Sequence, residues 1–194
     1  YDARRLHALG HTDVYVSVNV SSKQFDQPNY VDTLTDTVLR SGLRPSALKL
    51  ELTESAIMKD TKDAIGKIIE IKRRLPGISF MVDDFGTGYS SLAYLSRLPV
   101  DVLKIDISFV MNLEERQNEK VVNAIINLGH SLELQIVAEG IETKDQWAYF
   151  AERRCEYMQG FYFLKPASIE DVANLITRRT EAAARSQAVL MVED

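Results

Sequence analysis

The feature of this sequence that most constrains its fold is a regular alternation between short apolar runs and longer segments of helical period. In the first run, 14–20, valines occupy every second position, and the runs 48–52 and 78–83 alternate in the same way. Each run is followed by a segment whose apolar residues fit one face of a helix, the first of them opening at Pro28 and closing at Gly42. This pattern is typical of a parallel α/β fold.

Three further runs, 100–106, 134–139 and 157–163, extend the pattern to six strand-helix units. A capping box formed by Thr143 and Gln146 predicts the start of one later helix, and Ser168 predicts the start of the last. Six such units fit either an open doubly wound sheet or part of an eight-stranded barrel. Because polar residues follow nearly every strand, and barrel enzymes build their sites at the carboxyl ends of their strands, the pattern favours a TIM-type (β/α) barrel with about six of its eight strands.

Composition excludes several classes of protein. The 23 basic and 28 acidic residues give a net charge of −5, which argues against binding to a nucleic acid polymer through its phosphates. No apolar run approaches the roughly 20 residues that a membrane span needs. The single cysteine, Cys155, excludes an intrachain disulfide framework and fits a reducing, cytoplasmic location.

Polar side chains gather at the predicted strand ends. Such a residue after a single strand is usually a turn former or a helix cap, but six successive strand ends of this kind indicate a shared site. Carboxylate and amide oxygens are ligands for Mg²⁺ or Mn²⁺, and a lysine among them is a candidate for holding or deprotonating a water. The residues in chain order are Asn19, Glu51 with Glu54, Asp83 with Asp84, Lys104 with Asp106, Glu139 with Glu142, and Gln159.

The segment 83–91, Asp-Asp-Phe-Gly-Thr-Gly-Tyr-Ser-Ser, is the most informative stretch. Its two glycines allow a tight turn close to a ligand, and its adjacent carboxylates can reach two neighbouring metals. Its Asp-Phe-Gly also occurs in kinases, but the other kinase motifs are absent. Its Gly-x-Gly lacks the third glycine of a dinucleotide-binding fingerprint.

Together these stretches resemble the EAL family of bacterial phosphodiesterases that act on cyclic di-GMP. The resemblance runs from Val14 to Pro166 in the family's order and spacing. The matching stretches are 17–21, Glu-Leu-Thr-Glu-Ser at 51–55, 83–92, Lys-Ile-Asp at 104–106 with Phe109, Ala-Glu-Gly-Ile-Glu-Thr at 138–143, and Gln159-Gly160 with Lys165-Pro166.

The resemblance implies a barrel that hydrolyses cyclic di-GMP to linear pGpG with two Mg²⁺ or Mn²⁺ ions. It implies that Lys104 binds and helps to activate the water, that Gln159 holds the outer shell of the site, and that Glu54 braces the 83–91 loop. Metal ligands by the same resemblance are Asn19, Glu51, Asp83 and Glu139, with Asp84 on the second metal. Loop and substrate positions are Gly86, Thr87, Gly88, Tyr89, Ser90 and Asp106, together with Glu142, an acidic position of the family.

The resemblance also predicts a partner and shows where this chain departs from the family. In the family the 83–91 loop lies near a dimer contact, so we expect a homodimer. The Glu-Ala-Leu motif that names the family would precede Tyr1, so we expect this chain alone to have impaired activity. Ile107 replaces a basic residue usual after the Lys-Ile-Asp motif. We assign the barrel to residues 1–176, a helical linker to 177–187, and to 188–194 the opening strand of a receiver domain in the same chain.

Two other functions stay open. A catalytically silent receptor would bind cyclic di-GMP and signal by contact, although silent members usually lack metal ligands that are present here. A magnesium- and lysine-dependent barrel enzyme acting on small oxyacids would account for Glu51, Asp83 and Lys104, but it would leave the 83–91 loop unexplained.

Overall fold

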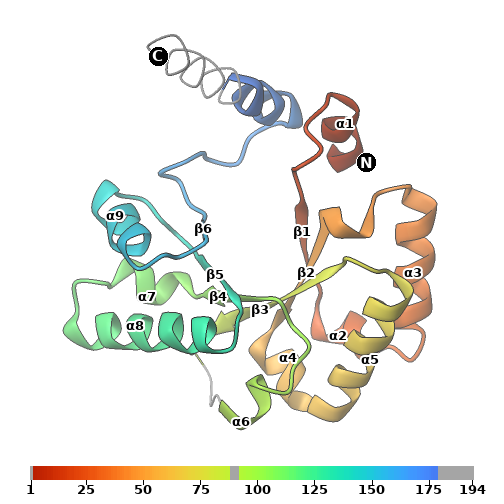
Figure 1. Cartoon of the computed structure of the whole chain (residues 1–194), viewed down its shortest axis with the longest axis horizontal. Coiled ribbons are helices and arrows are strands. Elements are labelled where there is room, and N and C mark those ends of the chain that lie inside the picture. The colour runs from red at the N-terminus through yellow and green to blue at the C-terminus, as the bar shows by residue number, and fades with distance from the viewer. Residues whose placement is uncertain (1, 88–91, 179–194) are drawn as a thin grey trace, which may run out of the picture.

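The structure is a computed structural model that describes residues 2–87 and 92–178. Six parallel strands form one sheet whose spatial order is the order of the chain. They are β1 (Val16–Asn19), β2 (Leu48–Thr53), β3 (Ser79–Phe85), β4 (Val102–Ile105), β5 (Gln135–Ala138) and β6 (Tyr157–Met158). Because the strand order never reverses, the sheet has no switch point. The sheet curves into a half-barrel with β1 and β6 as its edge strands (Figure 1). The predicted TIM-type barrel is confirmed.

Helices cover the outer surface of this half-barrel. Figure 1 shows α3 and α5 on one side and α8 and α9 on the other. The helices are α1 (Asp2–Ala8), α2 (Ser22–Phe25), α3 (Tyr30–Ser41), α4 (Glu54–Lys59), α5 (Thr61–Arg74), α6 (Leu92–Leu95), α7 (Ile107–Met111), α8 (Arg116–Ser131) and α9 (Lys144–Glu152), with a 3₁₀ turn, η1, at Pro45–Ala47. Residues 169–178 are also helical and lie beside α1, where Arg5 pairs with Glu170.

Local sequence signals set several helix ends where we expected them, although α3 begins at Tyr30, two residues after the predicted start at Pro28. Gly42 ends α3 in the left-handed conformation, with φ of 66°. Thr143 and Gln146 form the complete capping box of α9, each side chain bonding the other residue's backbone N–H. Ser168 Oγ accepts a hydrogen bond from the backbone N–H of Asp171, at 3.2 Å, in the first turn of the last helix.

Strand alternation separates two packed regions. Side chains on the outer face, such as Leu50, Phe80 and Leu103, join helix residues such as Ile68 and Ile126 in the main core. Met81, Val102 and Val137 form a smaller cluster on the inner face, against Tyr157. Because successive side chains of a strand point to opposite faces, the polar residues between the outward-facing leucines of β2 face into the barrel.

The prediction of a long strand over 157–163 is wrong, because the paired strand stops at Met158. The chain turns over residues 160–163, where the N–H of Phe163 donates to the carbonyl of Gly160 at 3.1 Å. A Cβ at Gly160 would lie 2.2 Å from the carbonyl oxygen of Ile141, so this turn is packed against the loop after β5. Phe161 lines a pocket instead of continuing a strand, and Phe163 packs against the main core.

The predicted linker overlaps the described structure only at residues 177 and 178, which are helical. The rest of the linker and the predicted receiver strand at 188–194 lie outside the described residues. Within residues 2–87 and 92–178, no helix combines the length and the apolar character that crossing a membrane requires.

Candidate active site

The carboxyl ends of three strands bring three carboxylates together inside the half-barrel. Glu51 lies on β2, Asp83 on β3, and Glu139 follows β5 directly. One carboxylate oxygen of each residue lies within 4.8 Å of the other two. Glu51 and Asp83 are buried and Glu139 is partly buried. We call these three residues the acidic cluster.

Lys104, on β4, places its ammonium group among these three carboxylates. Its Nζ lies 2.9 Å from Asp83 Oδ1 and also bonds the carboxylates of Glu51 and Glu139. Only 3% of the residue is exposed. Burial by itself would lower the pKa of Lys104, but the hydrogen bonds to the acidic cluster outweigh it and raise that pKa above its ordinary value. Lys104 is therefore an ammonium donor at neutral pH.

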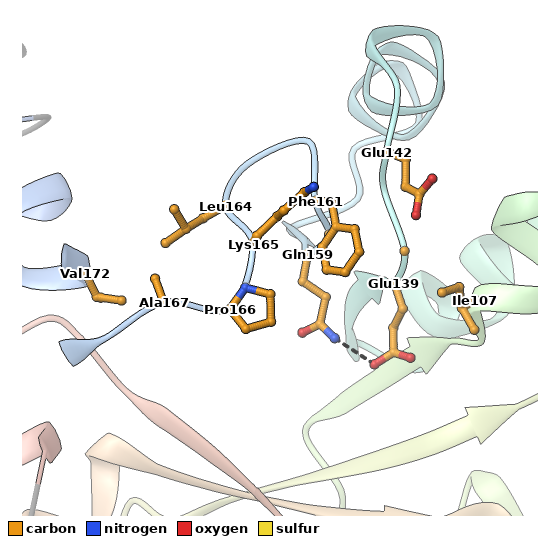
Figure 2. Close-up of a pocket in the computed structure, with 12 residues that line it drawn as sticks. Ile107, Glu139, Glu142, Gln159, Phe161, Leu164, Lys165, Pro166, Ala167 and Val172 are labelled. Atoms are coloured by element: carbon orange, nitrogen blue, oxygen red, sulfur yellow. Dashed lines mark hydrogen bonds between the residues drawn. The ribbon is translucent and has the colours of Figure 1, made fainter.

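Gln159 extends the site from the end of β6. Its Nε2 donates a hydrogen bond to Glu139 Oε1 at 2.9 Å, as Figure 2 shows. Burial raises the pKa of Glu139, and the neighbouring carboxylates add to that effect while Lys104 opposes it. Gln159 thus supplies one neutral donor to a carboxylate whose charged form is costly to bury.

Two other predicted ligands lie next to the acidic cluster. Asn19 ends β1 directly opposite Glu51 in the strand register, and its side chain is exposed. Asp84 follows Asp83 with a φ of 55°, and its backbone N–H donates to Asp83 Oδ1 at 3.0 Å. Burial raises the pKa of Asp84, and the charges of Asp83 and Asp106 raise it further. Asp84 therefore lies within electrostatic range of the cluster.

Glu54 faces the loop after β3 instead of the acidic cluster. Its carboxylate accepts a hydrogen bond from the Tyr94 hydroxyl at 3.0 Å and one from the backbone N–H of Gly86 at 3.4 Å. Gly86 has a φ of 95°, and a Cβ there would lie 3.1 Å from both Phe109 and Ile125. Thr87 closes the turn by donating from Oγ1 to the Asp84 carbonyl at 2.8 Å. These contacts fix residues 84–87, whereas Gly88, Tyr89 and Ser90 lie outside the described residues.

The remaining two predicted residues are not brought into the cluster. Asp106 caps α7, where its Oδ1 accepts from the N–H of Ser108 at 2.8 Å. Glu142 is exposed, and its backbone N–H donates to Gln146 Oε1. In Figure 2 the Glu142 side chain lies apart from the Gln159–Glu139 pair.

A pocket of about 480 Å³ opens beside Glu139 and Gln159. Apolar side chains form most of its wall, among them Ile107, Phe161 and Leu164 (Figure 2). The Lys165 ammonium lies 5.8 Å from the centre of the Phe161 ring. The sequence pattern predicts a strand at Phe161, so the apolar side of this pocket was not predicted. No spacing signal links Phe161 to Ile107.

Two more contacts could not be predicted, because they join residues that lie far apart in the sequence. Tyr94 reaches Glu54 across 40 positions of sequence. Lys49, on the inner face of β2, lies against the rings of Tyr15 and Tyr157. Strand parity could place Lys49 on the same face as Glu51, but only the curvature of the sheet brings the distant Tyr15 and Tyr157 to it.

The donor set fits a divalent cation. Three carboxylates face one ammonium, so two negative charges stay uncompensated when all three are ionised. Oxygen donors without histidine or thiolate suit Mg²⁺ or Mn²⁺. A parallel half-barrel that carries an acidic cluster and a buried lysine at its strand ends belongs to the α/β-barrel proteins, whose enzymes build their sites at this face.

Within that class, the chain belongs to the EAL domain family, whose model matches residues 1–166. The cyclic di-GMP phosphodiesterase NbdA of Pseudomonas aeruginosa is 42% identical over 166 residues, which are 85% of this chain and 21% of NbdA. The chain thus spans about a fifth of the length of that curated relative.

Solved structures agree with this membership. The PaMucR phosphodiesterase in complex with c-di-GMP has 39% identity and a TM-score of 0.83, over 88% of this chain and 69% of that one. The manganese/cy-diGMP complex of Klebsiella pneumoniae BlrP1 has 27% identity and a TM-score of 0.74, over 86% of this chain and 42% of that one.

Proposed function

We propose that this chain is the catalytic module of a metal-dependent phosphodiesterase that hydrolyses cyclic di-GMP to linear pGpG. The single observation that carries the proposal is the convergence of Glu51, Asp83 and Glu139 around Lys104. Its support is the family membership together with the names of the relatives, which include a cyclic di-GMP phosphodiesterase and a phosphodiesterase in complex with c-di-GMP.

The acidic cluster would hold the first cation, with Asn19 beside it, and Asp84 would reach a second. When bound, Mg²⁺ or Mn²⁺ supplies positive charge to the phosphodiester and makes a water more acidic. The chain's own contribution is to hold carboxylates together whose repulsion would otherwise separate them, and Lys104 does this with one ammonium.

Lys104 would act as a hydrogen-bond donor. Its ammonium bonds all three carboxylates of the acidic cluster and can also hold a water by the water's oxygen. It can also stabilise negative charge that develops on a phosphate oxygen. Gln159 would orient Glu139, and Glu54 would brace the turn at residues 84–87 through Gly86 and Tyr94.

The test is hydrolysis of cyclic di-GMP by the chain with Mn²⁺, with the product separated by chromatography. We expect linear pGpG from the wild-type chain and a loss of about a hundredfold or more for Asp83→Asn, which removes one cluster charge. Asp36→Asn is the matched control, because Asp36 is exposed on α3 in an ion pair with Arg40.

Two outcomes would contradict the proposal. Hydrolysis that is unchanged in Asp83→Asn would remove the acidic cluster from the chemistry. Tight binding of cyclic di-GMP without any turnover, by the chain extended with an upstream Glu-Ala-Leu segment and in the presence of Mn²⁺, would identify a silent receptor.

A further inference from the structure

Lys49 is a buried cation that lies below the acidic cluster on the same face of β2. It precedes Glu51 by two positions, and 7% of the residue is exposed. Among the described residues, no carboxylate forms an ion pair with it, and burial lowers its pKa while the more distant charge of Asp101 opposes that effect. A buried ammonium without an ion-pair partner needs another source of stabilisation.

Two aromatic rings supply that stabilisation. The Lys49 Nζ lies 3.9 Å from the centre of the Tyr15 ring and 4.5 Å from the centre of the Tyr157 ring. The two rings also contact each other edge to face, with centres 6.0 Å apart. Cation–π contacts are strongest where the cation is shielded from water, and Lys49 is buried while both tyrosines are partly buried. We call Lys49, Tyr15 and Tyr157 the inner cluster.

The inner cluster connects β1 and β6, the two edge strands of the sheet. Tyr15 directly precedes β1, Lys49 belongs to β2, and Tyr157 begins β6. In the described structure β6 pairs only with β5, through two residue pairs, Val137 with Tyr157 and Ala138 with Met158. Backbone pairing therefore fixes β6 from one side over a very short length, and the inner cluster fixes it from inside the barrel.

The position of β6 determines where Gln159 lies. Gln159 follows Tyr157 by two residues, so both side chains face inward. Its backbone N–H donates to the Ala138 carbonyl at 2.9 Å, its carbonyl accepts from the Ile141 N–H at 3.0 Å, and its side chain donates to Glu139. A shift of Tyr157 would thus be transmitted to the Gln159–Glu139 hydrogen bond over two residues of extended chain.

We propose that Lys49, held between Tyr15 and Tyr157, is a positioning residue that fixes β6 across the barrel and so places Gln159 on Glu139. The structural part of this inference is independent of the reaction. Its catalytic consequence rests on the proposed function.

The first test measures backbone hydrogen exchange in the full chain. Lys49→Met removes the charge and keeps the length, and it should speed exchange at the amides of Gln159 and Ile141 by about tenfold or more, because these hydrogen bonds hold the end of β6. Exchange at Leu50, in the core, should change much less. Lys49→Arg keeps a cation over the rings and should stay close to the wild type.

Lys67→Met is the matched control. Lys67 also lies over an aromatic ring, with its Nζ 5.3 Å from the centre of Phe25, but it belongs to α5 on the outside of the barrel. It should leave the Gln159 and Ile141 amides unchanged. Where Lys49→Met does not fold, Tyr15→Leu removes one ring without touching the lysine and should produce the same local effect. Wild-type exchange at these amides in every folded variant of the inner cluster would overturn the proposal.

The second test is a double-mutant cycle between Lys49 and Gln159, read as turnover of cyclic di-GMP. If Lys49 acts through Gln159, Lys49→Met should lower turnover about tenfold in the wild-type background and have little further effect in Gln159→Ala. Equal losses in both backgrounds would show that Lys49 contributes only general stability and would overturn the positioning role. An inactive wild-type chain would contradict the proposed function alone, and the exchange test would then decide this inference by itself.

Discussion

The Lys104 ammonium shows how one side chain can determine the state of three others. It bonds every member of the acidic cluster from a position that is 3% exposed, so a single cation offsets part of the charge of all three carboxylates. Removing one partner from such a buried network lowers the free energy of unfolding strongly, because it leaves uncompensated charge in the interior.

Lys104→Met should therefore lower the free energy of unfolding by about 3 kcal/mol at neutral pH. The loss should be smaller in acid, because protonated carboxylates no longer repel one another, so the deficit must grow as the pH rises. Turnover should fall by about a hundredfold or more. Urea unfolding at two pH values and the hydrolysis assay measure both effects.

Lys120→Met, on the exposed side of α8, is the control for Lys104→Met. It should change neither stability nor turnover appreciably. A Lys104→Met protein as stable as wild type across the pH range would show that the acidic cluster is held by something other than this ammonium.

Cys155 offers a second prediction for a single residue. It is 7% exposed, and burial raises the pKa of its thiol to about 12. Because the thiolate is the reactive form, the folded chain should resist alkylation at about pH 8, and the unfolded chain should react readily. Iodoacetamide labelling followed by mass spectrometry, with and without urea, checks this. Rapid labelling of the folded chain would contradict the burial of this thiol.

At the scale of elements, the sequence was sufficient to predict features that depend on residues close together in the chain. Strand parity placed Glu51 opposite the outward-facing leucines, and the caps at Gly42 and Thr143 lie where the sequence predicted them. The end of β6 could not be predicted this way. Its turn is set by the packing of Gly160 against the backbone of Ile141, a contact between two loops that no local pattern encodes.

Gly160→Ala tests that packing directly. The new Cβ would lie 2.2 Å from the Ile141 carbonyl oxygen and 2.3 Å from its nitrogen, so the loop must move. We expect a loss of about 2 kcal/mol or more in stability, together with weaker substrate binding in the adjoining pocket. Chemical denaturation and calorimetric titration with cyclic di-GMP measure the two effects.

Gly66→Ala is the opposite case and serves as the control for Gly160→Ala. Gly66 lies within α5 and a Cβ there meets nothing within 4 Å. Alanine should stabilise this helix by up to about 1 kcal/mol. Equal effects of the two substitutions would show that the contact with Ile141 does not determine which side chain fits at residue 160.

At the scale of the whole molecule, the half-barrel concentrates negative charge at one end. A divalent cation bound there should stabilise the folded chain, because the unfolded chain has no assembled cluster. Mn²⁺ at about a hundred times its Kd should add about 2.7 kcal/mol of stability. Thermal unfolding with and without Mn²⁺ should show this gain in the wild type and in Asp36→Asn, but not in Asp83→Asn. Equal gains in all three would place the cation elsewhere.

The candidate site could be read from the sequence as far as strand order and parity determine it. Those two features bring Glu51, Asp83, Lys104 and Glu139 to one end of the barrel, and the roles assigned to them stay predictions. The inner cluster was not readable, because Lys49 meets Tyr15 and Tyr157 only when the sheet curves. Glu142, predicted as a substrate or loop position, lines the pocket beside Glu139 and Gln159 but does not join the acidic cluster.

The consecutive order of the strands has a consequence for how the molecule is made. Each strand pairs with the one synthesised just before it, so the sheet can grow unit by unit as the chain leaves the ribosome. The contact between Tyr15 and Tyr157 differs from these strand pairs, because its two rings belong to segments that lie far apart in the sequence. Gln159 therefore joins Glu139 only once β6 has been added beside β5, and a chain interrupted before β6 would carry its three clustered carboxylates without this side chain.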